Sequence, residues 1–461
     1  MAKARFSLLL GVLAVAGCAS YTDQALQLRE PLLRGDFESA RAFLEETKPG
    51  GEGLPYLMEL GLVLRLQEDY TASNQAFDAA EILIDELYTK SISKEVLALA
   101  TNDEVIPYDG EIWERVLINY YRAMNYADLG DFEDALVECR KINHKLKVYA
   151  DGQASQPTYR TDAFAEYLTA MFYDASGQTN DAWVALRAAD DAYAHYETAY
   201  GVKPPPFLAQ DLLRNAEMMG DTDGARFDRE RFQAASWPTN GDLLDRGEII
   251  VFYEEGYVPA KAQQRIVLPI LRTEYDDDHR TDLAWTLAER ARDAEPPHYA
   301  RTELEYLLHI AVPYYPPPTT SDLPGHAIVF AGSDSCRSEI AEDLGAIARQ
   351  GWQDESAQIY FKTILRALGK YALTKSIENK PGEVAGVVAN LFTAASEKAD
   401  TRSWITLPNT IQIARVLVEP GSHDVEIQCY GPGGDELDTV TFEDVEVGPG
   451  QVRFLSHRTF H

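Results

Sequence analysis

The side chains that could do chemistry in this chain do not gather into a recognisable catalytic motif. The run Asp276-Asp277-Asp278-His279 could offer oxygen ligands to a hard cation. It lacks the glycine turn and the bidentate glutamate of a calcium loop, which favours a solvated acidic loop. Gly332 to Ser335 lacks the glycine that follows the serine in a nucleophile elbow, and zinc-protease, phosphate-loop and dinucleotide-binding spacings are absent. The sequence therefore predicts a protein without enzymatic activity, cofactor or metal.

Three cysteines of the predicted mature chain stand far apart in the sequence, at Cys139, Cys336 and Cys429. No pair has the spacing of zinc ligands or of a redox motif, and at most one disulfide can join them. Cys139 falls on the apolar register of a predicted helix, where a thiol behaves as a small hydrophobic group. We expect structural cysteines, and the sequence leaves open whether any two of them pair.

A fourth cysteine, Cys18, has the most specific predicted chemistry. It follows a cationic start with Lys3 and Arg5, an apolar run over residues 6–16 and the small pair Ala16-Gly17. This arrangement resembles a bacterial lipoprotein signal, which implies that residues 1–17 are a cleaved signal peptide and that Cys18 carries a thioether-linked lipid. An ordinary secretory signal with an incidental cysteine is the alternative. An apolar run of this length is too short to span a bilayer.

The residue after that cysteine bears on location. Ala19, rather than aspartate, follows Cys18, and the resemblance therefore implies anchoring in the outer membrane, facing the periplasm. The chain of 461 residues has a net charge of −32, which repels nucleic acid and excludes a nucleic-acid partner. Hydrophobic residues make up 45%, enough for a substantial core. We expect a membrane partner only through the lipid on Cys18.

An internal repeat is the next strongest signal. The stretch from Tyr120 to Ala135 recurs 47 residues later from Tyr167 to Ala182, with seven of sixteen positions identical. The pattern of a glycine, any four residues and an alanine also begins at Gly35 and at residue 220, and a version without the glycine begins at residue 68. These stretches resemble tetratricopeptide repeats, which are antiparallel helix pairs with small residues where the helices cross. They predict an irregular helical repeat domain over residues 18–236.

Two aromatic and two methionine side chains occupy equivalent places in the repeated stretches: Tyr120, Met124, Tyr167 and Met171. On the repeat template these first-helix positions line the concave groove that holds a partner segment. Tyrosine offers rigid contact area and methionine adapts to varied apolar surfaces. The alternative is that the four are core residues at helical spacing. The groove interpretation makes them the candidate partner-binding residues.

The pattern changes at the turn-rich residues 237–241. We predict a β-rich middle domain over 241–332, a helical segment over 335–398 and a C-terminal β domain over 400–461. Glycine–proline turns separate four short strands in the last of these, which suggests a small β-sandwich packed against the middle strands. The apolar residues 384–395 are expected to form a buried helix, and Arg402 with Trp404 to anchor a domain junction. The predicted fold class is α+β.

Three segments carry a family resemblance. The first runs from Glu111-Ile-Trp-Glu-Arg115 through Asn119-Tyr-Tyr121 to Glu138-Cys-Arg140, the second is Glu255-Gly-Tyr-Val-Pro-Ala-Lys261, and the third is Ala399-Asp-Thr-Arg-Ser-Trp404. Together they resemble a family of largely uncharacterised proteobacterial lipoproteins with tetratricopeptide-like repeats. The resemblance implies an envelope protein with no assigned chemistry.

Three functions are compatible with this sequence. The first is a non-enzymatic scaffold or adaptor that binds an envelope protein, in cell-wall synthesis or outer-membrane assembly. The alternative is a glycan- or ligand-binding lipoprotein, because 25 tyrosines and six tryptophans could supply stacking platforms. An envelope hydrolase with a carboxylate pair is the weakest hypothesis, since no pair stands out among 74 acidic residues. The identity of the partner and the oligomeric state are not encoded in any motif.

Overall fold

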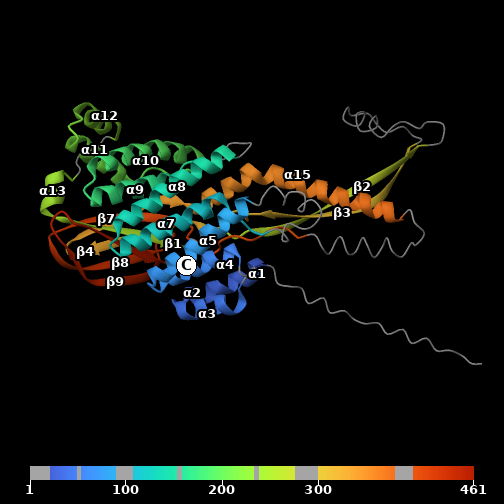
Figure 1. The fold of residues 1–461 in the computed structure, drawn as a ribbon, viewed down its shortest axis with the longest axis horizontal. Coiled ribbons are helices and arrows are strands. Elements are labelled where there is room, and N and C mark those ends of the chain that lie inside the picture. The colour runs from blue at the N-terminus through green and yellow to red at the C-terminus, as the bar shows by residue number, and fades with distance from the viewer. Residues whose placement is uncertain are drawn as a thin grey trace, which may run out of the picture.

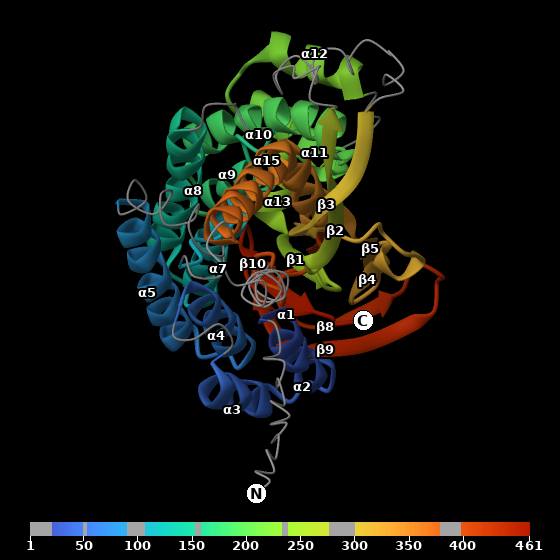
Figure 2. The same cartoon turned by 90° about the vertical axis from the view of Figure 1, so that its right-hand side faces the viewer.

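The computed structural model describes residues 21–48, 53–89, 107–152, 158–232, 238–275, 300–378 and 398–461. These residues form three layers, an array of helices, a first sheet against it and a second sheet beyond (Figures 1 and 2). The predicted α+β class, with an N-terminal helical array and C-terminal sheets, is confirmed. No helix among the described residues is both long enough and apolar enough to cross a bilayer.

The first half of the chain is helical, and its helices pack as successive antiparallel pairs, α2 with α3, α4 with α5, α7 with α8, α9 with α10 and α11 with α12. The bounds are α1 (Tyr21–Ala25), the 3-10 turn η1 (Leu26–Leu28), α2 (Arg29–Leu33), α3 (Phe37–Thr47), α4 (Leu54–Leu66), α5 (Tyr70–Thr89), α7 (Ile112–Asp128), α8 (Phe132–Gly152), α9 (Ala163–Ala175), α10 (Thr179–Tyr200), α11 (Pro206–Met218), α12 (Thr222–Phe232) and α13 (Asn240–Asp245).

The turns inside these helix pairs occur at the glycines of the sequence repeat. Gly130 and Gly177 have φ angles of 79° and 71°, the left-handed conformation that glycine adopts without steric cost. Glu68 takes the same conformation, with φ 61°, in the repeat that lacks the glycine. In the first pair an aspartate follows the turn glycine and caps α3: the Asp36 carboxylate accepts from the Ser39 N–H at 3.0 Å. The repeat signal thus corresponds to real helix boundaries.

The second half of the chain contributes the strands and one long helix. The bounds are β1 (Gly247–Glu255), β2 (Ala262–Tyr275), β3 (Ala300–Tyr314), the 3-10 turn η5 (Thr320–Asp322), β4 (His326–Ala331), β5 (Asp334–Arg337), β6 (Glu339–Asp343), α15 (Leu344–Glu378), β7 (Thr410–Val418), β8 (Gly421–Tyr430), β9 (Glu436–Val447) and β10 (Val452–Arg458). The first sheet has the order β10-β1-β7-β6, the second has the order β5-β4-β8-β9, and β2 pairs only with β3.

The sandwich is larger than predicted, because strands from the middle of the chain enter both of its sheets. In the first sheet β1 pairs in parallel with β10 and antiparallel with β7, and in the second β4 pairs with β8. The predicted middle region at 241–332 and the predicted C-terminal region at 400–461 are therefore interleaved in space. The consecutive strands β1 and β2 do not form a hairpin, since β2 belongs to another sheet.

The central strand β1 is buried along its whole length. Its alternate side chains point to opposite layers, as strand geometry requires. Ile250 and Phe252 belong to the same apolar core as the helical array. Ile249 and Val251 belong to the core between the two sheets. The first sheet is thus the middle layer of the molecule.

An arm extends from this three-layered body (Figure 1). It consists of the β2–β3 hairpin and the C-terminal half of α15, joined by apolar contacts that include Leu308, Ile310 and Ala367. A helical segment was predicted over 335–398, but its first residues form the short strand β6, because residues 339–343 pair with β7, and α15 begins only at Leu344. The helix predicted at 384–395 lies outside the described residues.

Candidate functional site

The structure does not leave the predicted concave groove open. The exposed fractions of Tyr120, Met124, Tyr167 and Met171 are 2%, 1%, 0% and 4%. All four belong to the core that joins the helical array to the first sheet. The expectation that they form an accessible partner-binding surface is therefore corrected, and the core alternative describes them. The physical reason is that the sheet of the same chain fills the face of the array on which they lie.

The hydroxyl groups of the two tyrosines form hydrogen bonds within the interface between the helical array and the first sheet. The Tyr120 hydroxyl donates to a Glu254 carboxylate oxygen of β1 at 3.0 Å. The Tyr167 hydroxyl donates to Asp211 at 2.8 Å and accepts from the guanidinium of Arg415, on β7, at 3.0 Å. Burial and the neighbouring carboxylates raise the pKa values of both phenols. These tyrosines hold the array to the sheet.

Of the other residues singled out in the sequence, several are structural. Cys139, Cys336 and Cys429 are free thiols, and burial raises the pKa of Cys139 and of Cys429 to about 12. Trp404 is fully buried, with its ring 5.7 Å from the ring of Phe77, so it does anchor the 398–407 loop to the array. Cys18 and the acidic run at 276–279 lie outside the described residues.

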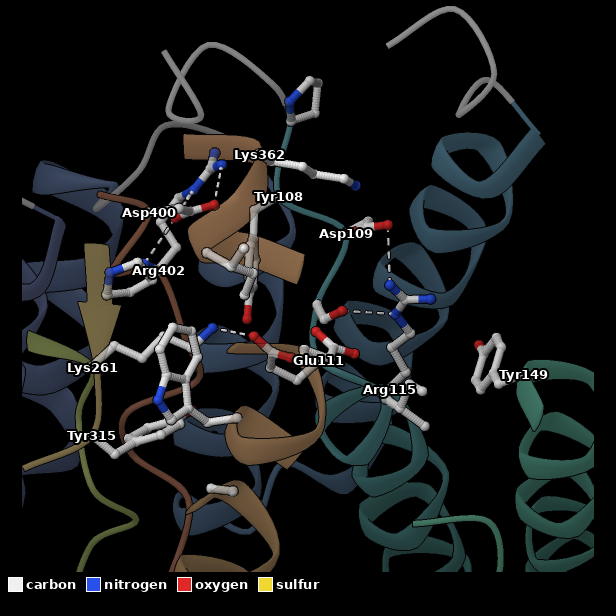
Figure 3. Close-up of a pocket in the computed structure, with 18 of the residues that line it drawn as sticks. Tyr108, Asp109, Glu111, Arg115, Tyr149, Lys261, Tyr315, Lys362, Asp400 and Arg402 are labelled. Carbon is white, nitrogen blue, oxygen red and sulfur yellow. Dashed lines mark hydrogen bonds and ion pairs between the residues drawn. The ribbon is translucent and has the colours of Figure 1, made fainter. Parts of the chain in front are cut away.

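A cavity of about 450 Å³ opens where the arm meets the helical array (Figure 3). It lies between the start of α7, the end of α8, the base of the β2–β3 hairpin and the first half of α15. Aromatic and charged side chains dominate its wall. They are Tyr108, Tyr149, Tyr315 and Trp352, with the acids Asp109, Glu111, Glu355 and Asp400 and the bases Arg115, Lys261, Lys362 and Arg402.

The three segments that carry the family resemblance meet at this cavity. Glu111 and Arg115 come from the first segment, Lys261 from the second, and Asp400 with Arg402 from the third. In the chain these segments are separated by well over a hundred residues. Folding thus brings together residues that had no chemistry assigned to them from the sequence.

Three ion pairs fix the charged side chains of the wall. Lys261 pairs with Glu111 in a close contact, and Figure 3 shows the lysine ammonium directed at that carboxylate. The other two pairs are Arg115 with Asp109 at 3.0 Å and Arg402 with Asp400 at 2.7 Å. Guanidinium groups also lie over aromatic rings, Arg115 over Tyr149 at 5.3 Å and Arg402 over Tyr108 at the same distance. The wall therefore presents donors and acceptors in fixed positions.

Glu114 supports this wall from beneath. It is fully buried and accepts hydrogen bonds from the Tyr108 hydroxyl at 2.6 Å, the Trp404 N–H at 2.7 Å and the Glu111 N–H at 3.0 Å. The last bond is half of a capping box at the start of α7. Burial, and then repulsion by Glu111, raise the pKa of Glu114 to about 7. The Glu114 carboxyl thus orients the Tyr108 ring, the first turn of α7 and the 398–407 loop.

Three further groups of the cavity have no ion pair or hydrogen bond to any described residue. Burial, and then the Glu111 carboxylate, raise the pKa of Glu355 to about 7, so this carboxyl can both donate and accept near neutral pH. The Tyr315 hydroxyl is buried and unpartnered in the described structure. Lys362 lies exposed on the same helix as Glu355. These three groups are available to a ligand.

No pattern in the sequence marks this site, although the segments that form it carry the family resemblance. Glu111 and Lys261 are ordinary charged residues in the sequence, and no spacing rule connects them. The available signal was that the resemblance motifs combine charged and aromatic residues outside the repeat positions. No group of three or more histidine, cysteine or carboxylate side chains among the described residues is placed to hold a metal ion.

Comparison with protein-family models and with curated proteins gives no match. Among solved structures, the chain is similar to MamA (41-end) from Desulfovibrio magneticus RS-1, with 16% identity, 46% of this chain and 93% of that chain covered, and a TM-score of 0.29. It is similar to nearly identical TPR-like repeats of a putative kinesin light chain from Podosopora anserina, with 15% identity, coverage of 46% and 92%, and a TM-score of 0.30. For BtubC from P. vanneervenii the identity is 16%, the coverage 46% and 78%, and the TM-score 0.31. Scores this low carry no argument about function, and the repeat arrangement rests on the helices described above.

Proposed function

We propose that this protein is a non-enzymatic binding protein of the bacterial cell envelope that holds a polar ligand in the cavity at the base of the arm. We further propose that a lipid on Cys18 anchors it at the periplasmic face of the outer membrane, on the strength of the signal-like residues 1–18. The observation that carries the binding role is the convergence of three distant segments on one cavity with fixed charges and aromatic walls.

The chemistry of the wall favours an uncharged ligand rich in hydroxyl groups, such as a short saccharide. Six of the eight charged side chains of the wall are joined in ion pairs, so the cavity offers little net charge to an ionic ligand. The carboxylates of these ion pairs still have free lone pairs, to which ligand hydroxyls can donate. The guanidinium and ammonium groups still have free N–H groups, from which ligand hydroxyls can accept. The aromatic side chains add apolar contact area. The volume lies within the range of about 300–1,000 Å³ found for small-molecule sites.

The test is calorimetric titration of the full chain in detergent with neutral oligosaccharides, namely chitotriose, maltotriose and cellotriose. We expect one of them to bind, and Trp352→Ala to weaken that binding at least tenfold. The matched control is Trp183→Ala on α10, whose ring lies under the Arg187 guanidinium at 4.2 Å and outside the cavity. Binding of none of the three sugars, or equal loss in the two variants, would contradict the proposal.

A protein-binding scaffold is the second candidate, and it needs a surface other than the filled groove. The outer helices of the array supply one observation in its favour. Val184 on α10 and Phe227 on α12 are 67% and 62% exposed. Photo-crosslinking in cells from position 184 would support the scaffold if it captured one envelope protein that a probe at Tyr120 did not capture. The same adduct at both positions would instead indicate that the array separates from the sheet.

A further inference from the structure

The arm has one apolar face that nothing in the described structure covers. Phe361, Leu365 and Leu368 are spaced four and three residues apart, which places them on one side of α15. Their exposed fractions are 63%, 45% and 41%. We call these three residues the outer face of α15. The hairpin packs on a different side of the helix, through Ile364 and Ala367.

The described chain begins beside the base of this arm. The Tyr21 hydroxyl donates to the Ser403 carbonyl at 2.9 Å. From the same loop, the Ala399 N–H donates to the Gln263 side chain, at the start of β2, at 2.9 Å. In Figure 1, α1 lies at the end of the body from which the arm extends, and Figure 2 views both from that end. Cys18 precedes Tyr21 by three residues, which can span at most about 10 Å. A lipid on Cys18 would therefore lie close to the base of the arm.

The charge of residues 361–375, in the part of α15 that belongs to the arm, also differs from the net charge of the whole chain. The whole chain has a net charge of −32, yet the stretch 361–375 contains four basic residues and no acidic one. They are Lys362, Arg366, Lys370 and Lys375; Lys362 is exposed, whereas Arg366 is buried and does not face the solvent. A helix that combines an exposed apolar face with basic residues is the type that lies in a membrane interface, where anionic headgroups attract it. The acidic body is repelled by the same headgroups, which favours contact through the arm.

We infer that the outer face of α15 lies against the bilayer in which the lipid of Cys18 is inserted. The helix has 35 residues and is about 50 Å long, so an arm that starts near the anchor is long enough for its outer face to reach the bilayer. The anchor keeps the outer face at a high effective concentration beside the lipid. This inference rests on the anchoring through Cys18 proposed above and is independent of the ligand cavity.

Tryptophan quenching by lipid tests this contact. Full-length, acylated protein is reconstituted into vesicles of phosphatidylethanolamine and phosphatidylglycerol that contain a phosphatidylcholine with brominated acyl chains. Phe361→Trp is compared with Phe227→Trp, a phenylalanine of nearly equal exposure, 63% against 62%, on α12. We expect the bromolipid to quench the added fluorescence of Phe361→Trp at least twofold more strongly than that of Phe227→Trp. Leu365→Asp in the Phe361→Trp chain should remove the difference without changing the thermal unfolding of the protein.

Two controls separate this inference from its premise. Incorporation of labelled palmitate and flotation with the vesicles report anchoring by themselves. Protein that carries palmitate and floats, but is quenched equally at positions 361 and 227, overturns the contact of α15 with lipid and leaves the anchoring intact. Protein without palmitate that does not float overturns the anchoring and the contact together.

Discussion

At the scale of single residues, the buried carboxyl of Glu59 shows how the array is joined to the C-terminal part of the chain. Glu59, on α4, is 1% exposed and accepts hydrogen bonds from the Ile405 N–H at 3.1 Å and from the Thr406 hydroxyl. Burial is the main cause that raises the pKa of this carboxyl to about 8. The neutral, protonated form therefore predominates in the folded protein at neutral pH.

This raised pKa predicts a stability that decreases with pH. A carboxyl whose pKa is higher in the folded state stabilises the fold fully below its unfolded pKa, 4.5, and that contribution is lost as the pH rises through about 8. Between pH 5 and pH 8 the loss is on the order of 3 kcal/mol. Urea unfolding of the parent and of Glu59→Gln at both pH values measures it. We expect a smaller pH dependence in the variant, and equal slopes would show that Glu59 is charged in the folded state.

Residue roles could be predicted from the sequence only where the cause is local. The helix-capping role of Asp36 follows from its place directly before a helix, and the structure shows the expected bond. The burial of Tyr120 and Tyr167 could not be decided in this way. Helical periodicity shows that they share a face, but what covers that face depends on a sheet formed by distant residues.

At the scale of elements, the pair of helices α4 and α5 depends on one glycine. A Cβ atom added at Gly61 would lie 2.5 Å from the ring of Phe77, so Gly61→Ala forces two helices apart. We expect a loss of about 1–3 kcal/mol in the free energy of unfolding. The matched control is Gly351→Ala in α15, where nothing lies within 4 Å and helix propensity favours alanine by about 0.5–1 kcal/mol. Denaturant titration of both variants checks the prediction, which fails if both are stabilised.

The elements themselves were more predictable than their partners. The four strands predicted in residues 400–461 are present as β7 to β10, because glycine–proline turns mark their ends. The sheets that these strands join could not be predicted. β7 and β10 both flank β1, and pairing between such distant segments leaves no local pattern in the sequence. The cavity could not be predicted for the same reason, as Glu111, Lys261 and Arg402 meet only in the folded chain.

At the scale of the whole molecule, the helical array depends on the sheet that fills its inner face. The first sheet covers apolar side chains such as Phe164 and Phe172, which are buried in the complete chain. We expect residues 21–232 alone to form soluble oligomers or aggregates, because exposed apolar patches of this size drive association. Light scattering after size exclusion, with the complete chain as the control, measures this. A monomeric array that unfolds cooperatively would show that it is an independent domain.

The parallel pairing of β1 with β10 also bears on the order in which the protein can be made. Glu248 pairs with Val452 and Glu254 with Arg458, so the partners of β1 lie in β10, the last strand in the sequence. A ribosome adds roughly 5–20 residues each second, so one edge of β1 waits without its neighbour for ten seconds or more. An unpaired strand edge is a template for aggregation. If the chain is exported unfolded, β1 forms only when β10 is also present. If it folds during synthesis in the cytoplasm, a chaperone would be needed to shield the unpaired edge of β1.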